Sequence, residues 1–174
     1  MAKHPRSERP AMEGYGVTDD PEGLLPWSWA EDRLGGRNFW FTTVRPDGRP
    51  HSMPVWGVWM PERQRWGFGC SPDSRKARNL AANPAVVVTT EDTVELVSIE
   101  GTAAPIDGEA AVPLIEAWVD KYADEIEVVD EASREQARDF LRQGAMFEIT
   151  PHRAFGLIER PDEFAAAATR WVWD

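Results

Sequence analysis

Short aromatic and β-branched segments, separated by turn residues, recur along this sequence. The first, Asn38–Val44, leads through Pro46-Asp47-Gly48 into a second at His51–Trp59, which is the pattern of a β-hairpin. Further strand-like segments lie at 65–70, 85–90, 94–103, 146–149, 154–158 and 169–173, with Thr-Pro-His at 150–152 as a turn. So many short strands favour an antiparallel barrel, because closure of the sheet removes exposed edges.

Helical patterns lie between the strands. We expect helices near 28–34, 74–82, 109–123 and 133–143. Ser28 and Ser133 each begin a capping-box pattern. The predicted fold class is therefore mainly β, a small Greek-key barrel with helices packed outside it.

The chain of 174 residues is long enough to bury a core of its own. Residues 1–23 are rich in charge, proline and glycine, which predicts a flexible N-terminal tail. Residues 24–174 contain no repeat and no linker that would divide them, so we expect a single domain there.

Composition excludes several classes of function. The net charge of −11 argues against a nucleic-acid binder, because phosphate backbones require a basic face. No apolar run approaches the length that spans a bilayer, so we expect no membrane association. The single cysteine, Cys70, cannot form an internal disulfide, which favours the reducing cytoplasm. His4, His51 and His152 lie too far apart to indicate a metal site.

Nine tryptophans are unusual for a chain of this length. They favour a large buried interface or a flat site for a ring-bearing ligand, although core packing could also account for many of them. On this basis we expect a homodimer.

Residues 66–84 combine a strand, a turn and a helix start. The segment Trp66–Cys70 runs into Ser71-Pro72-Asp73, and Ser74 stands where an N-cap belongs. A helix start presents free backbone N–H groups, so it can hold a phosphate, and here it also carries Arg75, Lys76 and Arg78. The alternative is an ordinary capped helix with a solvated basic face.

The sequence shows no evident nucleophile, acid–base pair or phosphate-loop motif. A protein that holds an anion site and many aromatic residues without a reactive group of its own can take its chemistry from a phosphate-bearing cofactor. The catalytic residues, if any, stay unassigned.

Several motifs occur in an order that resembles a known family. They are Thr43-Val44-Arg45-Pro46-Asp47-Gly48-Arg49-Pro50-His51, Met53-Pro54-Val55-Trp56, Ser74-Arg75-Lys76-Ala77-Arg78-Asn79-Leu80, Asn83-Pro84 and Glu100-Gly101-Thr102-Ala103. Together they resemble the pyridoxamine 5′-phosphate oxidase-like split-barrel superfamily over about residues 27–104, with a weaker similarity at 168–171. The resemblance implies a six-stranded split barrel and a homodimer with cofactor sites between the subunits. Members use FMN or the deazaflavin coenzyme F-420, whereas others use haem or have lost activity.

The resemblance also assigns a binding site. It places the cofactor phosphate at Ser74, Arg75, Lys76 and Asn79, the ring along Met53, Pro54, Val55 and Trp56, and the sugar-alcohol chain near Cys70 and Ser71. The alternative for 53–56 is simply a core strand.

The oxidase itself is a poor match, because its phosphate-binding Arg and Lys on the second and third strands have no obvious equivalent here. The Pro-Val-Trp and Ser-Arg-Lys-Ala-Arg-Asn-Leu sequences look closer to deazaflavin-dependent reductases. The resemblance therefore favours F-420 over FMN, although the acidic net charge opposes the polyglutamate tail of F-420. The function predicted is a flavin- or deazaflavin-dependent oxidoreductase acting on a small organic molecule. The alternative is a non-catalytic cofactor-binding or carrier protein of the same fold.

The last residues alternate in character. If 169–173 is a strand, Trp171 and Trp173 share one face and Arg170 lies on the other. We expect the tryptophans to pack on the barrel or on the partner subunit, and Arg170 to point to the cofactor or substrate. The alternative is that this segment only plugs the barrel.

Overall fold

The computed structural model describes residues 4–173. Its helices are η1 (Glu13–Tyr15, a 3₁₀ turn), α1 (Trp27–Leu34), α2 (Arg75–Ala82), α3 (Gly108–Lys121), α4 (Glu131–Arg142) and α5 (Phe164–Ala167). Its strands are β1 (Arg6–Glu8), β2 (Asn38–Val44), β3 (Pro50–Trp56), β4 (Val58–Met60), β5 (Arg65–Cys70), β6 (Ala85–Thr90), β7 (Glu95–Ile106), β8 (Ala145–Ile158) and β9 (Thr169–Val172). No helix within residues 4–173 is both long enough and apolar enough to cross a bilayer.

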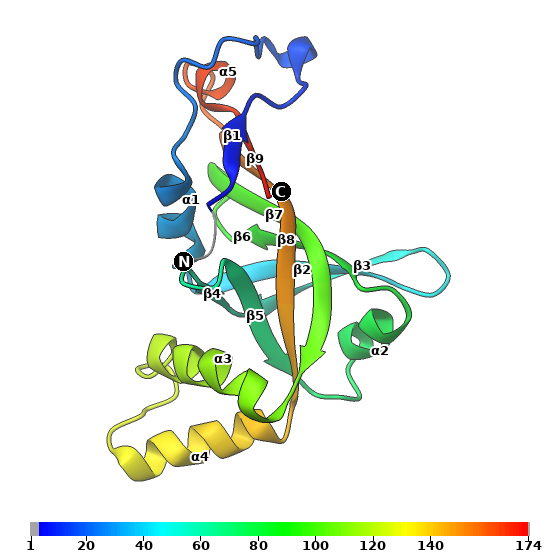
Figure 1. Cartoon of the computed structure of the whole chain (residues 1–174), viewed down its shortest axis with the longest axis vertical. Coiled ribbons are helices and arrows are strands. Elements are labelled where there is room, and N and C mark those ends of the chain that lie inside the picture. The colour runs from blue at the N-terminus through cyan, green and yellow to red at the C-terminus, as the bar shows by residue number, and fades with distance from the viewer. Residues whose placement is uncertain (1–3, 174) are drawn as a thin grey trace.

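The strands form one antiparallel sheet that closes on itself. Its order is β1-β9-β8-β7-β6-β2-β3, and β5 pairs with both β4 and β8. Because β4 follows β3 after a single residue, Gly57, the ring β2, β3/β4, β5, β8, β7 and β6 is a six-stranded barrel, as predicted. Figure 1 shows α3 and α4 side by side at one end of the barrel and β1 with β9 at the other.

Three predicted strands differ in extent from those observed. The segment 51–59 is broken at Gly57, where a Cβ atom would lie 2.0 Å from the Trp66 ring. The segments 146–149 and 154–158 are instead one strand, β8. Residues 150–152 form no turn, because a register shift opposite Glu100 and Gly101 accommodates Pro151 within the ladder.

Helix starts also differ from the capping-box predictions. Helix α1 begins after Pro26 without a side-chain cap, so Ser28 lies inside the helix. Helix α4 is capped by Asp130, whose carboxylate accepts a hydrogen bond from the Ser133 amide. Ser133 thus supplies the reciprocal half of the capping box rather than the N-cap itself.

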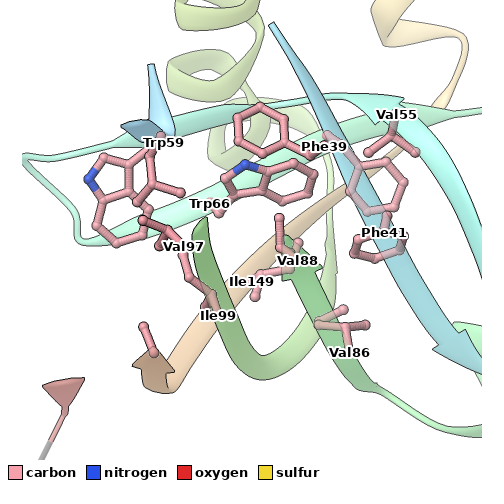
Figure 2. Packing of buried hydrophobic residues seen from close by; sticks show 14 of the residues in the cluster. Phe39, Phe41, Val55, Trp59, Trp66, Val86, Val88, Val97, Ile99 and Ile149 are labelled. Atoms are coloured by element: carbon pink, nitrogen blue, oxygen red, sulfur yellow. The ribbon is translucent and has the colours of Figure 1, made fainter. Parts of the chain in front are cut away.

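The interior of the barrel is filled by aromatic and branched side chains (Figure 2). Trp66 is completely buried and stacks on Phe41 with ring centroids 5.8 Å apart, while Phe39 meets it edge-on at 5.3 Å. Val88 and Ile149 belong to the same cluster and lie on the neighbouring strands, Val88 opposite Phe41 in the β2–β6 ladder and Ile149 opposite Trp66 in the β5–β8 ladder. Burial of this apolar surface supplies the main stabilisation of the barrel.

A second hydrophobic cluster lies between the barrel and α3. It includes Leu114, Trp118 and Tyr122 from α3, together with Met60 from β4 and Met146 from β8. This cluster fixes α3 against the outside of the β3–β4 corner and, through Leu141, holds the end of α4. Helix α3 and the end of α4 are thus anchored near the ends of β3 and β5.

The N-terminal segment is tied to the domain, in contrast to the flexible tail that its composition predicts. Strand β1 pairs with β9, and the guanidinium of Arg9 donates hydrogen bonds to the carbonyls of Asp20, Glu22, Ala166 and Ala168. The composition of 1–23 concealed this because the contacts are made by backbone groups and one side chain. The part of that prediction that concerns residues 1–3 lies outside the described residues.

Candidate functional site

Most of the residues that the sequence assigned to the cofactor line one cavity of about 520 Å³. Strand β3 contributes Pro54, Val55 and Trp56, and the end of β5 contributes Cys70 with the adjacent Ser71. Ser74 and Lys76 come from the start of α2. The fold therefore brings together segments that are separated by up to about twenty residues in the chain.

The turn between β5 and α2 is held by its own hydrogen bonds. The Ser74 amide donates to the Ser71 carbonyl at 3.0 Å, and Ser71 Oγ accepts from the Asp73 amide at 3.2 Å. Ser74 Oγ accepts from the Ala77 amide at 3.2 Å, so Ser74 is the N-cap of α2 as predicted. The amides of Arg75 and Lys76 precede the first helical bond and stay available to an anion.

Positive charge is concentrated around this helix start. The pKa of His51 is lowered first by partial burial and then by the nearby charges of Arg45, Arg75 and Lys76. Arg45, Arg75 and Lys76 thus lie close enough to His51 to oppose its protonation, in a strongly acidic protein. His51 was not predicted as a site residue, because nothing in the sequence around it shows that Arg45, Arg75 and Lys76 lie nearby in space.

A wall of the cavity comes from the α3–α4 region, which the sequence did not assign to any site. Trp118 of α3, Phe140, Leu141 and Gln143 at the end of α4, and Met146 of β8 line it. The helical spacing of Trp118 indicated only an inward-facing side chain. No local signal places the end of α4 beside β3, because that contact depends on the tertiary packing of the second hydrophobic cluster.

Four predicted site residues lie outside the cavity lining: Asn79, Arg75, Met53 and Arg170. Asn79 is buried, and its amide nitrogen donates to Thr43 Oγ1 at 2.8 Å, which fixes α2 against β2. Arg75 is exposed at the start of α2 and contributes through its charge. Met53 is 47% exposed and lies opposite Phe41 in the β2–β3 ladder.

Arg170 is separated from the other predicted site residues. It lies opposite Glu8 and Phe155 in the sheet, and its Nε donates to the Glu8 carboxylate at 2.7 Å. Arg170 lines a different hollow of about 600 Å³ on the outer face of the sheet. The pairing of β9 with β1 explains the separation, because it provides Arg170 with a carboxylate partner far from α2.

The two C-terminal tryptophans pack on the barrel, as expected. Trp171 is completely buried, and its ring meets Trp27 edge-on at 5.3 Å. Trp173 meets the same ring at 4.9 Å. Trp27 of α1 is thus the common contact of this end of the chain.

The donors around the cavity fit a phosphate-bearing ligand. Lys76 supplies a point charge, Ser71 a hydroxyl, and the start of α2 backbone N–H groups. The remaining lining is mostly apolar, which suits a ring system. Within residues 4–173, no group of three or more His, Cys, Asp or Glu side chains is arranged to hold a metal ion.

Solved structures with the same fold support this architecture. The conserved hypothetical protein Rv2991 from Mycobacterium tuberculosis superimposes with a TM-score of 0.68 at 19% identity, covering 83% of this chain and 92% of that one. An F-420 reductase gives a TM-score of 0.54 at 20% identity, covering 71% and 94%. HutZ, the heme storage protein from Vibrio cholerae, gives 0.51 at 21% identity, covering 74% and 91%. At these identities the likeness concerns the fold alone.

Comparison with curated protein sequences finds no match. The sequence profile of the pyridoxamine 5′-phosphate oxidase family, in contrast, matches residues 34–156, a span that begins at the end of α1 and ends near the end of β8. It includes all of the six-stranded barrel except the last two residues of β8, contains all of the cavity lining, and covers well over half of the chain. The chain belongs to the pyridoxamine 5′-phosphate oxidase family.

Proposed function

We propose that this protein is an oxidoreductase that binds a flavin-type cofactor, F-420 in preference to FMN, with the cofactor phosphate at the start of α2. The observation that carries the proposal is the positive helix start of Ser74, Arg75 and Lys76 at one end of a mostly apolar cavity. An acidic protein has no general reason to gather cations there, so a bound anion explains the cluster. The fold that the protein shares with an F-420 reductase supports the same cofactor class.

The residues of the chain then have separate tasks. Lys76 and the amides of α2 hold the phosphate, and the backbone of Pro54–Trp56 orients the ring. Trp56 and the apolar wall exclude water from the reacting face. A bound deazaflavin or flavin would supply the hydride chemistry, since the cavity lining offers no acid–base side chain apart from Lys76 and Cys70.

The test of this function is fluorescence titration of the full chain with F-420 and with FMN. We expect saturable binding of F-420, and Lys76→Ala should weaken it by about 10- to 150-fold, the usual worth of a hydrogen bond to a charged group. Arg78→Ala is the matched control, because Arg78 is an exposed cation of the same helix outside the cavity lining. Equal affinities for Lys76→Ala and Arg78→Ala would contradict the assignment of the phosphate to Lys76.

His51 provides a second readout that does not depend on turnover. A bound anion offsets the charges of Arg75 and Lys76, so the pKa of His51 should rise when F-420 or inorganic phosphate binds. Proton NMR of the His51 ring, titrated with and without ligand, measures this shift. His4, which is exposed near the N-terminus, serves as the internal reference.

The second candidate function is non-catalytic binding or storage of a cofactor. The fold likeness to a heme storage protein favours it, as does the scarcity of reactive side chains in the cavity. A protein that binds F-420 or FMN but never exchanges electrons with any reductant or acceptor would support this candidate. Binding of haem in place of both flavin-type cofactors would support storage of haem instead.

A further inference from the structure

The cavity has two unlike ends. The end at α2 carries Lys76, which is the one charged side chain in the cavity lining. The opposite end is formed by Trp118, Phe140, Leu141 and Met146 and contains no charged group. A ligand that fills the whole cavity, or a pair of ligands that share it, therefore meets an anion site at one end and an apolar site at the other.

The apolar end has a rigid aromatic wall. The Trp56 and Tyr122 rings are stacked at 4.7 Å with an interplanar angle of 9°, and Trp118 lies 5.7 Å from Trp56. The Tyr122 hydroxyl donates to the Arg37 carbonyl at 2.7 Å and accepts from the Gly57 amide at 2.9 Å. These bonds fix the stack, so the wall is in place before a ligand arrives.

Phe140 is an exposed ring at the mouth of this end. It is 73% exposed, whereas the neighbouring Leu141 is 4% exposed. The rest of α4 is strongly polar, and Leu141 is its one buried residue. An exposed phenyl group on a polar helix stabilises a complex only when a ligand covers it, because burial of that apolar surface is favourable.

The position of Phe140 is set by ionic contacts between α4 and α3. Arg138 makes two hydrogen bonds to the Glu116 carboxylate, at 2.8 and 3.0 Å, and Arg134 pairs with Asp120. The Arg138 side chain is mostly shielded from solvent. This two-pronged bond holds the end of α4 beside the cavity.

We propose that the apolar end binds the substrate of the oxidoreductase, that this substrate is an uncharged, planar, ring-bearing molecule, and that Phe140 determines this specificity by packing over the ring. The inference rests on the function proposed above. The Trp56 ring, held by its stack on Tyr122 and with Trp118 tilted beside it, provides an aromatic surface on one side, and Phe140 covers the ligand from the other. A carboxylate or phosphate on the substrate would be desolvated there with no cation in the lining of that end to pair with it, so anionic substrates are disfavoured.

The experiment uses two fluorescent probes that differ by one sulfonate group, 1-anilinonaphthalene and 1-anilinonaphthalene-8-sulfonate. Each is titrated into the full chain with saturating inorganic phosphate, which occupies the α2 end. The neutral probe should bind, with energy transfer from the tryptophans. The sulfonate should bind at least about tenfold more weakly, because the one cation of the cavity lining, Lys76, is blocked by phosphate.

Phe140→Ala should weaken binding of the neutral probe by about 5- to 30-fold, and Phe140→Leu should lose less of the affinity. Tyr15→Ala is the matched control, since Tyr15 is 71% exposed and lies in η1 outside the cavity lining. Circular dichroism of each variant confirms that the fold is retained, which is expected for an exposed position.

The outcomes separate this inference from the proposed function. If neither F-420 nor FMN binds but the affinity for the neutral probe falls in Phe140→Ala, the apolar binding site is confirmed and the oxidoreductase proposal fails. If a cofactor binds but Phe140→Ala has the same affinity for the neutral probe as the wild type, or if the sulfonate binds as tightly as the neutral probe, the inference is overturned while the proposed function is unaffected.

Discussion

Lys121 is a half-buried cation at the end of α3. Its Nζ donates to the Gly57 carbonyl at 2.8 Å and lies 4.8 Å from the Phe39 ring centroid. Burial lowers its pKa to about 8, although the Glu125 and Glu91 carboxylates act in the opposite direction. Lys121 therefore fixes the backbone at Gly57, next to Trp56, but its own charge is partly desolvated there.

This shift predicts how stability depends on pH. Between about pH 8 and pH 10.5 the unfolded chain keeps the Lys121 proton and the folded chain has lost it, so this group makes the free energy of unfolding rise with pH. Lys121→Met removes the effect. Urea unfolding at about pH 7.5 and about pH 9.5 should show that the wild type gains stability relative to the variant at the higher pH.

The pH range of that experiment is limited by Tyr122. Burial raises the pKa of Tyr122 to about 12, so this group lowers stability once the unfolded tyrosine titrates near pH 10. The wild type and Lys121→Met share this contribution, and it cancels in the comparison. A stability difference that does not change with pH would show that Lys121 titrates normally in the folded protein.

At the level of residues, local chemistry made part of the site predictable. Ser74 is the N-cap of α2 because its side chain and the amide it satisfies lie three residues apart in the chain. Lys76 was predicted from the same helix start, because it lies two residues after the N-cap Ser74. Phe140 and His51 were not predicted, because their importance depends on what lies across from them in space.

Among the elements, the pairing of β1 with β9 closes the end of the sheet opposite α3 and α4 (Figure 1). Arg9, which follows β1, joins this end of the sheet to the loop before α1. Its guanidinium donates hydrogen bonds to carbonyls of that loop, Asp20 and Glu22, and to the carbonyls of Ala166 in α5 and Ala168 just before β9. Three residues of backbone pairing alone would hold β1 weakly.

We therefore expect Arg9→Ala to release β1 without unfolding the barrel. Backbone amides of Arg6–Glu8 and of the loop at 20–24 should exchange with deuterium much faster, while those of β6 and β7 keep their protection. Arg6→Ala is the control, because Arg6 pairs with Glu8 inside β1 and contacts neither the loop nor α5 among the described residues. Unchanged exchange in Arg9→Ala would mean that strand pairing is sufficient.

Prediction of elements succeeded where each segment carries its own signal. The hairpin of β2 and β3 has a turn motif between two aromatic or β-branched strands, and it was located from sequence. Strand β8 was divided at Pro151, because a proline inside a strand normally indicates an interruption. Only the partner strand, with its register shift at Glu100 and Gly101, reveals that the ladder continues.

On the scale of the whole molecule, the tryptophan content no longer indicates a second subunit. Of the nine tryptophans, all of which lie in the described residues, only Trp40 is strongly exposed. The others fill the barrel and the contacts around Trp27 and Trp118. The dimer proposal therefore depends on the outer face of the sheet around Trp40.

We propose that this face is a subunit interface. Trp40 of β2, 48% exposed, lies between Pro54 of β3 and Thr89 of β6 in the ladder. The adjacent hollow of about 600 Å³ is lined by apolar residues of β2 and β6, including Val44 and Val87, and by the charged side chains of Glu8, Glu100, Arg153 and Arg170. A stable interface needs about 800 Å² from each partner, and an exposed aromatic anchor is typical of its centre.

We expect the full chain to sediment as a homodimer at micromolar concentration and Trp40→Glu to sediment as a folded monomer, because two carboxylates would be buried at the centre of the interface. Tyr15→Glu, which changes an equally exposed aromatic residue of η1, should stay dimeric. Because family resemblance places the cofactor between subunits, the Trp40→Glu monomer should also bind F-420 more weakly, even though Lys76 and α2 are intact. A wild-type chain that is a stable, folded monomer at this concentration would rule out the dimer, and the cavity of a single chain would then have to hold the cofactor by itself.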